Sequence, residues 1–194
     1  MISGQAAAKV ASGRPASDPL ASSFRRSLAW IVDVVLVTAL VFGGVSIVDA
    51  ALGPAVSFHP EAATLSDTVV VDRADVAVEA LFATVLNAAY FVVPWALLGA
   101  SPAQLALRIR VRGAADGEML PVGRALVRWV LLFPPFATIS ALGAGVPLLA
   151  RFVWGSALAW YVVLLLSTAR NASNQGLHDR IAGTVVEKSR TAVG

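Results

Sequence analysis

The stretch that decides the fold is SLAWIVDVVLVTALVFGGVSIV, residues 27–48, in which Asp33 is the one charged residue. An α-helix rises about 1.5 Å per residue, so this run is long enough to cross the roughly 30 Å hydrocarbon core of a bilayer. Arg25 and Arg26 precede it, as basic residues precede the apolar part of a secretory signal. The run is longer than that part of a signal, and no clear small-residue cleavage site closes it. We therefore predict an uncleaved first transmembrane helix.

Two further stretches extend the membrane interpretation. One covers about 76–98, and the other, 125–168, is too long for a single crossing. The sequence GAGVP at 143–147 divides the second stretch into predicted spans near 127–143 and 149–168. The sequence thus predicts an all-α membrane protein with about four transmembrane helices in a small bundle.

The composition agrees with this fold class. Hydrophobic residues make up 57% of the chain and charged residues 14%, and the mean hydropathy is +0.74. These values lie outside the range of ordinary soluble domains. Arg128, the Pro134-Pro135 pair and Arg151 leave open a re-entrant hairpin or an interfacial helix between residues 125 and 168.

Basic residues alternate with acidic ones between the predicted spans. Segment 49–79 carries six carboxylates and Arg73 as its one basic residue, whereas both termini and the connection after the second span are rich in arginine. The positive-inside rule then places both termini in the cytoplasm. Residues 1–23, rich in Ala, Ser and Gly, are predicted to form a disordered cytoplasmic tail, and residues 188–194 a C-terminal tail.

A short amphipathic β segment is predicted on the cytoplasmic side. Apolar and basic residues alternate strictly in LRIRVR, residues 107–112, which on a strand places three arginines on one face. A second β-type run, Thr184-Val185-Val186, is a candidate partner strand.

Asp33 is the most informative single residue, because a carboxylate inside an apolar helix must be paired, neutralised or exposed to water. It follows Arg26 by two helical turns, so the two share a face and a direct pair is possible. A structural ion pair and an ion or proton site remain open alternatives. Glu79 and Asn87 share a face of the second span and are either a polar stripe lining a pathway with Asp33 or ordinary interhelical contacts.

The connection after the second span carries a concentrated positive surface. Anionic lipid headgroups are the preferred partner, and an acidic ligand or partner protein is the alternative. The charges lie in clusters separated by apolar runs, so nucleic acid is not expected. The basic residues are Arg108, Arg110, Arg112, Arg124 and Arg128.

Enzymatic and metal chemistry find no support. The chain has no cysteine, which excludes disulfides and thiolate sites, and its two histidines, His59 and His178, lie far apart in the sequence. His178-Asp179 alone is a weak metal motif. No catalytic triad, phosphate loop or dinucleotide fingerprint is present. We expect no enzyme activity, metal or cofactor.

Three ordered motifs resemble the RDD family of prokaryotic membrane proteins, over about residues 22–187. They are FRRSLAWIVD at 24–33, SPAQLALRIRV at 101–111 with Asp116-Gly117 and GRALVR following, and QGLHDRIAGTVV at 175–186. The central motif departs from the family pattern, which has Gly-Lys at Ala103-Gln104 and Gly at Arg108.

The resemblance assigns the family's arginine and two aspartates to Arg26, Asp33 and Asp179, within an RDD-like domain at 24–187. It implies a multi-pass protein of the bacterial plasma membrane, for which transport, including cation/proton exchange, has been suggested. The sharper hypothesis is a small transporter or transporter subunit that acts as a homo-oligomer or with another membrane protein, with Asp33 as its ion or proton site. The alternative is a non-transporting accessory or scaffold protein that binds anionic lipids or a partner protein.

Overall fold

The computed structural model describes residues 20–58, 69–133, 139, 147–170 and 175–189. Three long helices dominate it: α2 (Ser23–Leu52), α3 (Arg73–Leu98) and α7 (Pro147–Ala169). Each contains a segment long and apolar enough to cross a membrane. Most of their large apolar side chains are exposed, as expected for helices whose surroundings are lipid.

Local sequence sets the ends of these helices. The Ser22 side chain accepts a hydrogen bond from the Arg25 backbone N–H at the start of α2, and Asp72 accepts from two backbone N–H groups at the start of α3. Gly99 ends α3 in the left-handed conformation, at φ 69°. These are the residue types that satisfy the free backbone groups of helix ends.

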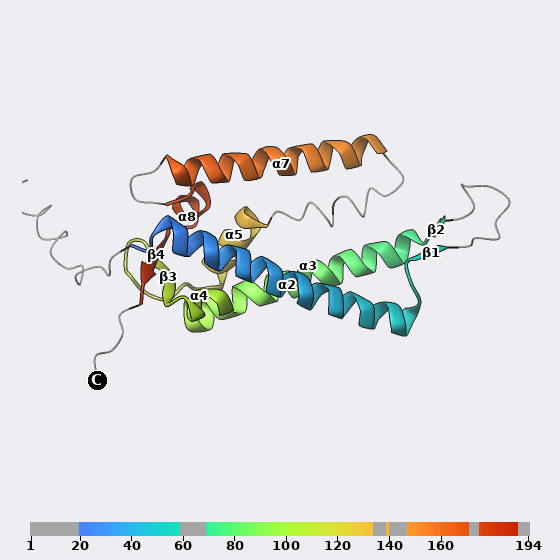
Figure 1. The fold of residues 1–194 in the computed structure, drawn as a ribbon, viewed down its shortest axis with the longest axis horizontal. Coiled ribbons are helices and arrows are strands. Elements are labelled where there is room, and N and C mark those ends of the chain that lie inside the picture. The colour runs from blue at the N-terminus through green and yellow to red at the C-terminus, as the bar shows by residue number, and fades with distance from the viewer. Residues whose placement is uncertain (1–19, 59–68, 134–138, 140–146, 171–174, 190–194) are drawn as a thin grey trace, which may run out of the picture.

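The smaller elements gather at the two ends of the long helices (Figure 1). One end, here called the sheet end, holds α4 (Pro102–Ala106), α5 (Val122–Leu132), α8 (Leu177–Ile181) and the strands β3 (Ile109–Gly113) and β4 (Thr184–Lys188). The other, the hairpin end, holds the antiparallel strands β1 (Val56–Phe58) and β2 (Val69–Val71). Helix α2 starts at the sheet end, α3 ends there, and α7 runs from the hairpin side back to it (Figure 1).

Three of the four predicted spans correspond to α2, α3 and α7. The span predicted at 127–143 is not confirmed, because α5 ends at Leu132 and the following residues, apart from Ile139, lie outside the described ranges. Helix α5 lies at the sheet end, whereas α7 starts on the hairpin side (Figure 1).

The pairing predicted between the two β runs is confirmed. Strands β3 and β4 are antiparallel, with Val111 opposite Val186 and Arg110 opposite Glu187. Ile109 and Val111 are fully buried while Arg110 is exposed, as the strict alternation requires. Ile109 and Val111 of β3 and Val186 of β4 thereby belong to the buried core.

The segment just before α2 adds to this sheet. Leu20 forms a bridge with Glu187, and the Ala21 N–H donates to the Val186 carbonyl at 3.0 Å. The predicted tail 1–23 therefore ends in ordered residues, because backbone pairing with β4 holds them. Its residues 1–19 lie outside the described ranges.

The buried core lies at the sheet end and joins α2, α3, α4, α5, β3 and β4. Phe91 stacks on Phe133 at 4.5 Å between ring centroids and contacts Trp95 at 5.3 Å. Around these rings pack buried apolar side chains of the helices and the sheet. They include Val37, Ala103, Ile109, Val111, Leu120, Ala125, Trp129 and Val186.

Arg108 has a backbone φ of 54°, and it is the one non-glycine residue with positive φ in the described ranges. A Cβ atom makes this conformation unfavourable by about 1–2 kcal/mol. We predict that Arg108→Gly raises the free energy of unfolding by about 1 kcal/mol, measured by thermal unfolding in detergent.

Arg110→Gly is the matched control, since Arg110 is exposed in the extended strand β3. There glycine relieves no strain and weakens the strand, so this variant is expected to unfold at a lower temperature. Equal changes in unfolding temperature for Arg108→Gly and Arg110→Gly would contradict the explanation by the positive φ of Arg108.

Candidate functional site

Asp33 lies on α2 and is 2% exposed. Its carboxylate accepts hydrogen bonds from the Ser101 hydroxyl, from the Tyr90 hydroxyl at 2.9 Å and from the Ala103 backbone N–H at 3.1 Å. The donors come from α3 and from the start of α4. Asp33 therefore joins the first long helix to the turn that follows the second.

The turn that receives Asp33 is built by its own sequence. Ser101 is the N-cap of α4, and Gln104 completes a capping box by accepting from the Ser101 N–H at 2.9 Å. The same Gln104 oxygen accepts from the Trp95 indole N–H at 3.0 Å. Gln104 thus has a structural role as an acceptor, which a lysine cannot fill.

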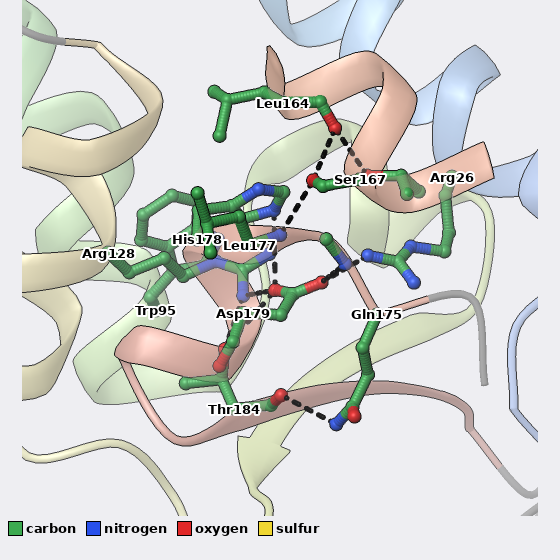
Figure 2. A network of polar contacts seen from close by, with 12 residues as sticks. Arg26, Trp95, Arg128, Leu164, Ser167, Gln175, Leu177, His178, Asp179 and Thr184 are labelled. Atoms are coloured by element: carbon green, nitrogen blue, oxygen red, sulfur yellow. Dashed lines mark hydrogen bonds and ion pairs between the residues drawn. The ribbon is translucent and has the colours of Figure 1, made fainter. Parts of the chain in front are cut away.

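Asp179 is the centre of a second polar cluster (Figure 2). Its fully buried carboxylate forms ion pairs with Arg26 of α2 and Arg128 of α5. It also accepts from the Thr184 hydroxyl at 3.2 Å and from the Gly176 N–H at 3.4 Å. We call Arg26, Arg128, Asp179 and Thr184 the Asp179 cluster.

The surroundings of Arg128 hold its guanidinium in place. Nη1 also donates to the Thr184 hydroxyl at 2.6 Å, and the guanidinium lies 5.1 Å from the centroid of the Trp95 ring. Figure 2 shows Arg128 and Arg26 approaching the Asp179 carboxylate from different elements. The cluster therefore ties α2, α5 and α8 together.

The cluster keeps Asp179 ionised. Burial by itself raises the pKa of the Asp179 carboxyl, but the positive charges of Arg128 and Arg26 outweigh burial and hold the pKa well below its ordinary range. Two guanidinium groups share this one carboxylate, so the loss of Asp179 leaves two buried or half-buried charges without their common acceptor.

His178 is neutral at pH 7, because burial lowers its pKa to about 4. Its Nε2 lies 3.4 Å from Asp179, and its Nδ1 has no hydrogen-bond partner in the described structure. A side chain at Gly176 would collide with the imidazole, its Cβ falling 2.6 Å from Cε1, so glycine is required for this packing. The described residues contain no group of three or more side chains able to hold a metal ion.

The predicted functional residues thus fall into separate places. Arg26 contacts Asp179, while Asp33 has a different set of partners, so the possible Arg26–Asp33 pair is replaced by a pair across the fold. Asn87 accepts from the Trp129 indole N–H at 2.8 Å. Glu79 lies beside Asp49 and Ala55 near the hairpin end, so these polar groups form no single stripe with Asp33.

The predicted basic surface needs one correction. Arg108, Arg110 and Arg124 are exposed and Arg112 is half-buried, but Arg128 is only 2% exposed and belongs to the Asp179 cluster. The Arg128 guanidinium is buried because it contacts the Asp179 carboxylate and donates to the Thr184 hydroxyl. Arg124 lies 3.6 Å from Asp116.

Sequence reasoning missed Tyr90, Ser101 and Thr184 as partners of the two aspartates. Ser101 had a local signal, since Ser-Pro-Ala-Gln is a capping-box sequence. Tyr90 and Thr184 had none, because their contacts join segments distant in the chain.

We predict an asymmetry between the members of the Asp179 cluster. Asp179→Ala leaves two arginines without their acceptor and should lower the free energy of unfolding by about 3–5 kcal/mol. Arg26→Ala leaves the neutral Arg128–Asp179 pair and should cost about 1–3 kcal/mol. Thermal unfolding of both variants in one detergent measures the difference, and a greater loss for Arg26→Ala would refute the shared-acceptor model.

His178 should make the protein sensitive to acid. Its ordinary pKa of 6.5 applies to the unfolded chain, and the folded value is about 4. Between these values the unfolded chain binds a proton that the folded protein excludes, so stability falls as pH drops. We expect a loss of about 2 kcal/mol at pH 5 relative to pH 7.

His178→Gln, which does not titrate, should remove most of this loss in unfolding scans at pH 7 and pH 5. The protonation of Asp179 does not enter this window, because its pKa lies well below it. An unchanged pH dependence in the variant would show that His178 is not the source.

No curated protein and no solved structure matches the sequence. The model of the RDD family matches residues 20–183, which include Arg26, Asp33, Arg128 and Asp179 and the three long apolar helices. The chain is a membrane protein that belongs to the RDD family.

Proposed function

We propose that this protein is a non-transporting accessory or scaffold protein of the bacterial plasma membrane. The observation that supports this proposal is that donors of the chain itself bind both motif aspartates. Asp33 accepts three hydrogen bonds, and Asp179 accepts from two arginines, a threonine and a backbone N–H. Carboxylates bound in this way have a structural role, because they connect separate segments of the chain.

An ion-binding role for Asp33 would need its oxygens to face an ion. A cation such as Na⁺ is held by several oxygen acceptors, whereas Tyr90, Ser101 and Ala103 all present donors to Asp33. Donors stabilise the carboxylate in place of an ion. The arrangement around Asp33 thus favours a structural role over ion coordination.

The Asp179 cluster also has a structural role, because it joins segments that lie far apart in the sequence. Arg26 is near the start of the chain's first span, Arg128 lies on α5, and Asp179 comes after the last span. Their ion pairs draw these distant segments together at the sheet end (Figure 2). Such ion pairs favour a rigid arrangement of the sheet-end elements α4, α5, α8, β3 and β4, here called the platform.

The platform carries outward-facing basic residues suited to an anionic partner. Arg108, Arg110 and Arg124 are exposed there. By the positive-inside rule this end faces the cytoplasm, which puts both termini inside. Its arginines then meet the negatively charged cytoplasmic leaflet.

Transport coupled to Asp33, including cation/proton exchange, is the competing proposal. One observation favours it: Asp33 is a buried carboxylate within an apolar segment long enough to span a membrane. In that case Asp33 would have to release Ser101 or Tyr90 during each cycle. A second copy or a partner protein would supply the rest of the pathway.

Flux through proteoliposomes separates the two proposals. We expect the wild-type protein to give no sodium- or proton-driven flux above protein-free vesicles, and Asp33→Asn to match it. Asp116→Asn is the control, because it removes an exposed carboxylate outside the apolar helices. Flux that vanishes in a monodisperse, correctly inserted Asp33→Asn protein but persists in Asp116→Asn would establish the transport reading instead.

A further inference from the structure

Three exposed arginines that lie outside the predicted basic surface are close in sequence to the contacts that join α2, α7 and α8. Arg25 precedes Arg26, whose guanidinium binds Asp179, and Arg180 directly follows Asp179. Arg170 comes three residues after Ser167, whose hydroxyl accepts from the first N–H of α8 at 2.9 Å. These contacts hold the start of α2, the end of α7 and α8 in one place (Figures 1 and 2).

No carboxylate in the described part of the chain neutralises the charges of these three arginines. None of them forms an ion pair with any residue in the described ranges. The nearby carboxylate of Asp179 is fully buried and taken by Arg26 and Arg128. By contrast, Arg124 has Asp116 beside it and Arg110 lies opposite Glu187. The junction is therefore the part of the sheet end with the least compensated positive charge.

Apolar side chains continue from this junction along both helices. Phe24 at the start of α2 is 75% exposed, and Leu28 follows one turn later. On α7, Leu165 is 70% exposed and Leu166 lies one turn before Arg170. The two apolar segments begin and end here, which places the arginines at the level of lipid headgroups and the leucines at the level of acyl chains.

We infer that Arg25, Arg170 and Arg180 bind the phosphate headgroup of an anionic phospholipid, whose acyl chains lie along α2 and α7. Guanidinium groups bind phosphate oxygens in pairs, and three of them on separate elements give a headgroup more contacts than a single surface arginine. This inference rests on the proposed accessory role and names its anionic partner. The bound lipid would also join α7 to the rest of the bundle.

The test compares two triple variants of the full chain in detergent. Arg25→Gln/Arg170→Gln/Arg180→Gln removes the junction, and Arg108→Gln/Arg110→Gln/Arg124→Gln removes the same charge elsewhere on the sheet end. Phosphatidylglycerol is titrated into each, with phosphatidylcholine as the neutral lipid, and the rise in unfolding temperature is recorded. For the junction variant we expect phosphatidylglycerol affinity to fall about 100-fold, at roughly five-fold per arginine, with a much smaller loss in the control variant.

Equal losses in the two variants would overturn the inference, because they would show a diffuse charge effect. Retained affinity in the junction variant would overturn it as well. So would equal stabilisation of the wild-type protein by glycerol phosphate, since that would show an anion site without a lipid. The single variants Arg170→Gln and Arg180→Gln, each at an exposed position, provide the same comparison if the triple variant does not fold.

The failure of this inference is distinguishable from failure of the proposed function. The junction variant leaves Asp33, Asp179 and their partners unchanged, so ion flux and lipid affinity respond to different residues. Flux through the wild-type protein would refute the accessory role and leave the lipid site standing. Unchanged phosphatidylglycerol affinity in the junction variant, with no flux through the wild-type protein, would refute the lipid site and leave the accessory role unaffected.

Discussion

The buried carboxylate of Asp179 and its two arginine partners hold the sheet end together. Removing a charge from water is costly, and a buried ion pair is maintained only where geometry and further hydrogen bonds compensate. Arg26, Arg128, Thr184 and the Gly176 N–H provide that compensation from four segments of the chain. Each of these segments must be in position before the carboxylate can be buried. The fold at this end therefore forms as a unit.

Asp33 is a second buried carboxylate that joins separate segments, and it lies on α2 two helical turns after Arg26. Its three donors attach α2 to α3 and to the start of α4, and α4 leads directly into strand β3. Strand β3 pairs with β4, which follows α8 and hence Asp179. The two aspartates are thus linked through the sheet and the core around Phe91 and Trp95. The charged motif residues of this chain stabilise a platform on which exposed arginines are displayed.

Elements with strong local patterns were predicted well. Apolar length identified α2, α3 and α7, and strict alternation identified β3 and its pairing with Thr184–Val186. These signals are local because burial in lipid or in a two-faced sheet acts on each residue by its position in the element. The helix predicted at 127–143 was not confirmed, since α5 ends at Leu132. Apolar content there was sufficient for a span, but it does not determine where a helix ends.

The sequence by itself determined that the chain is a membrane protein and where its long helices lie, and its resemblance to the RDD family pointed to Arg26, Asp33 and Asp179. It left open which of these charges meet. Tertiary structure decided that Arg26 and Arg128 share Asp179, and that Asp33 binds Tyr90, Ser101 and the Ala103 N–H. The physical reason is that apolar length and alternation act between neighbours in the chain. The partner of a buried charge is chosen by whichever donors the whole fold brings within hydrogen-bond distance, however far apart they lie in sequence.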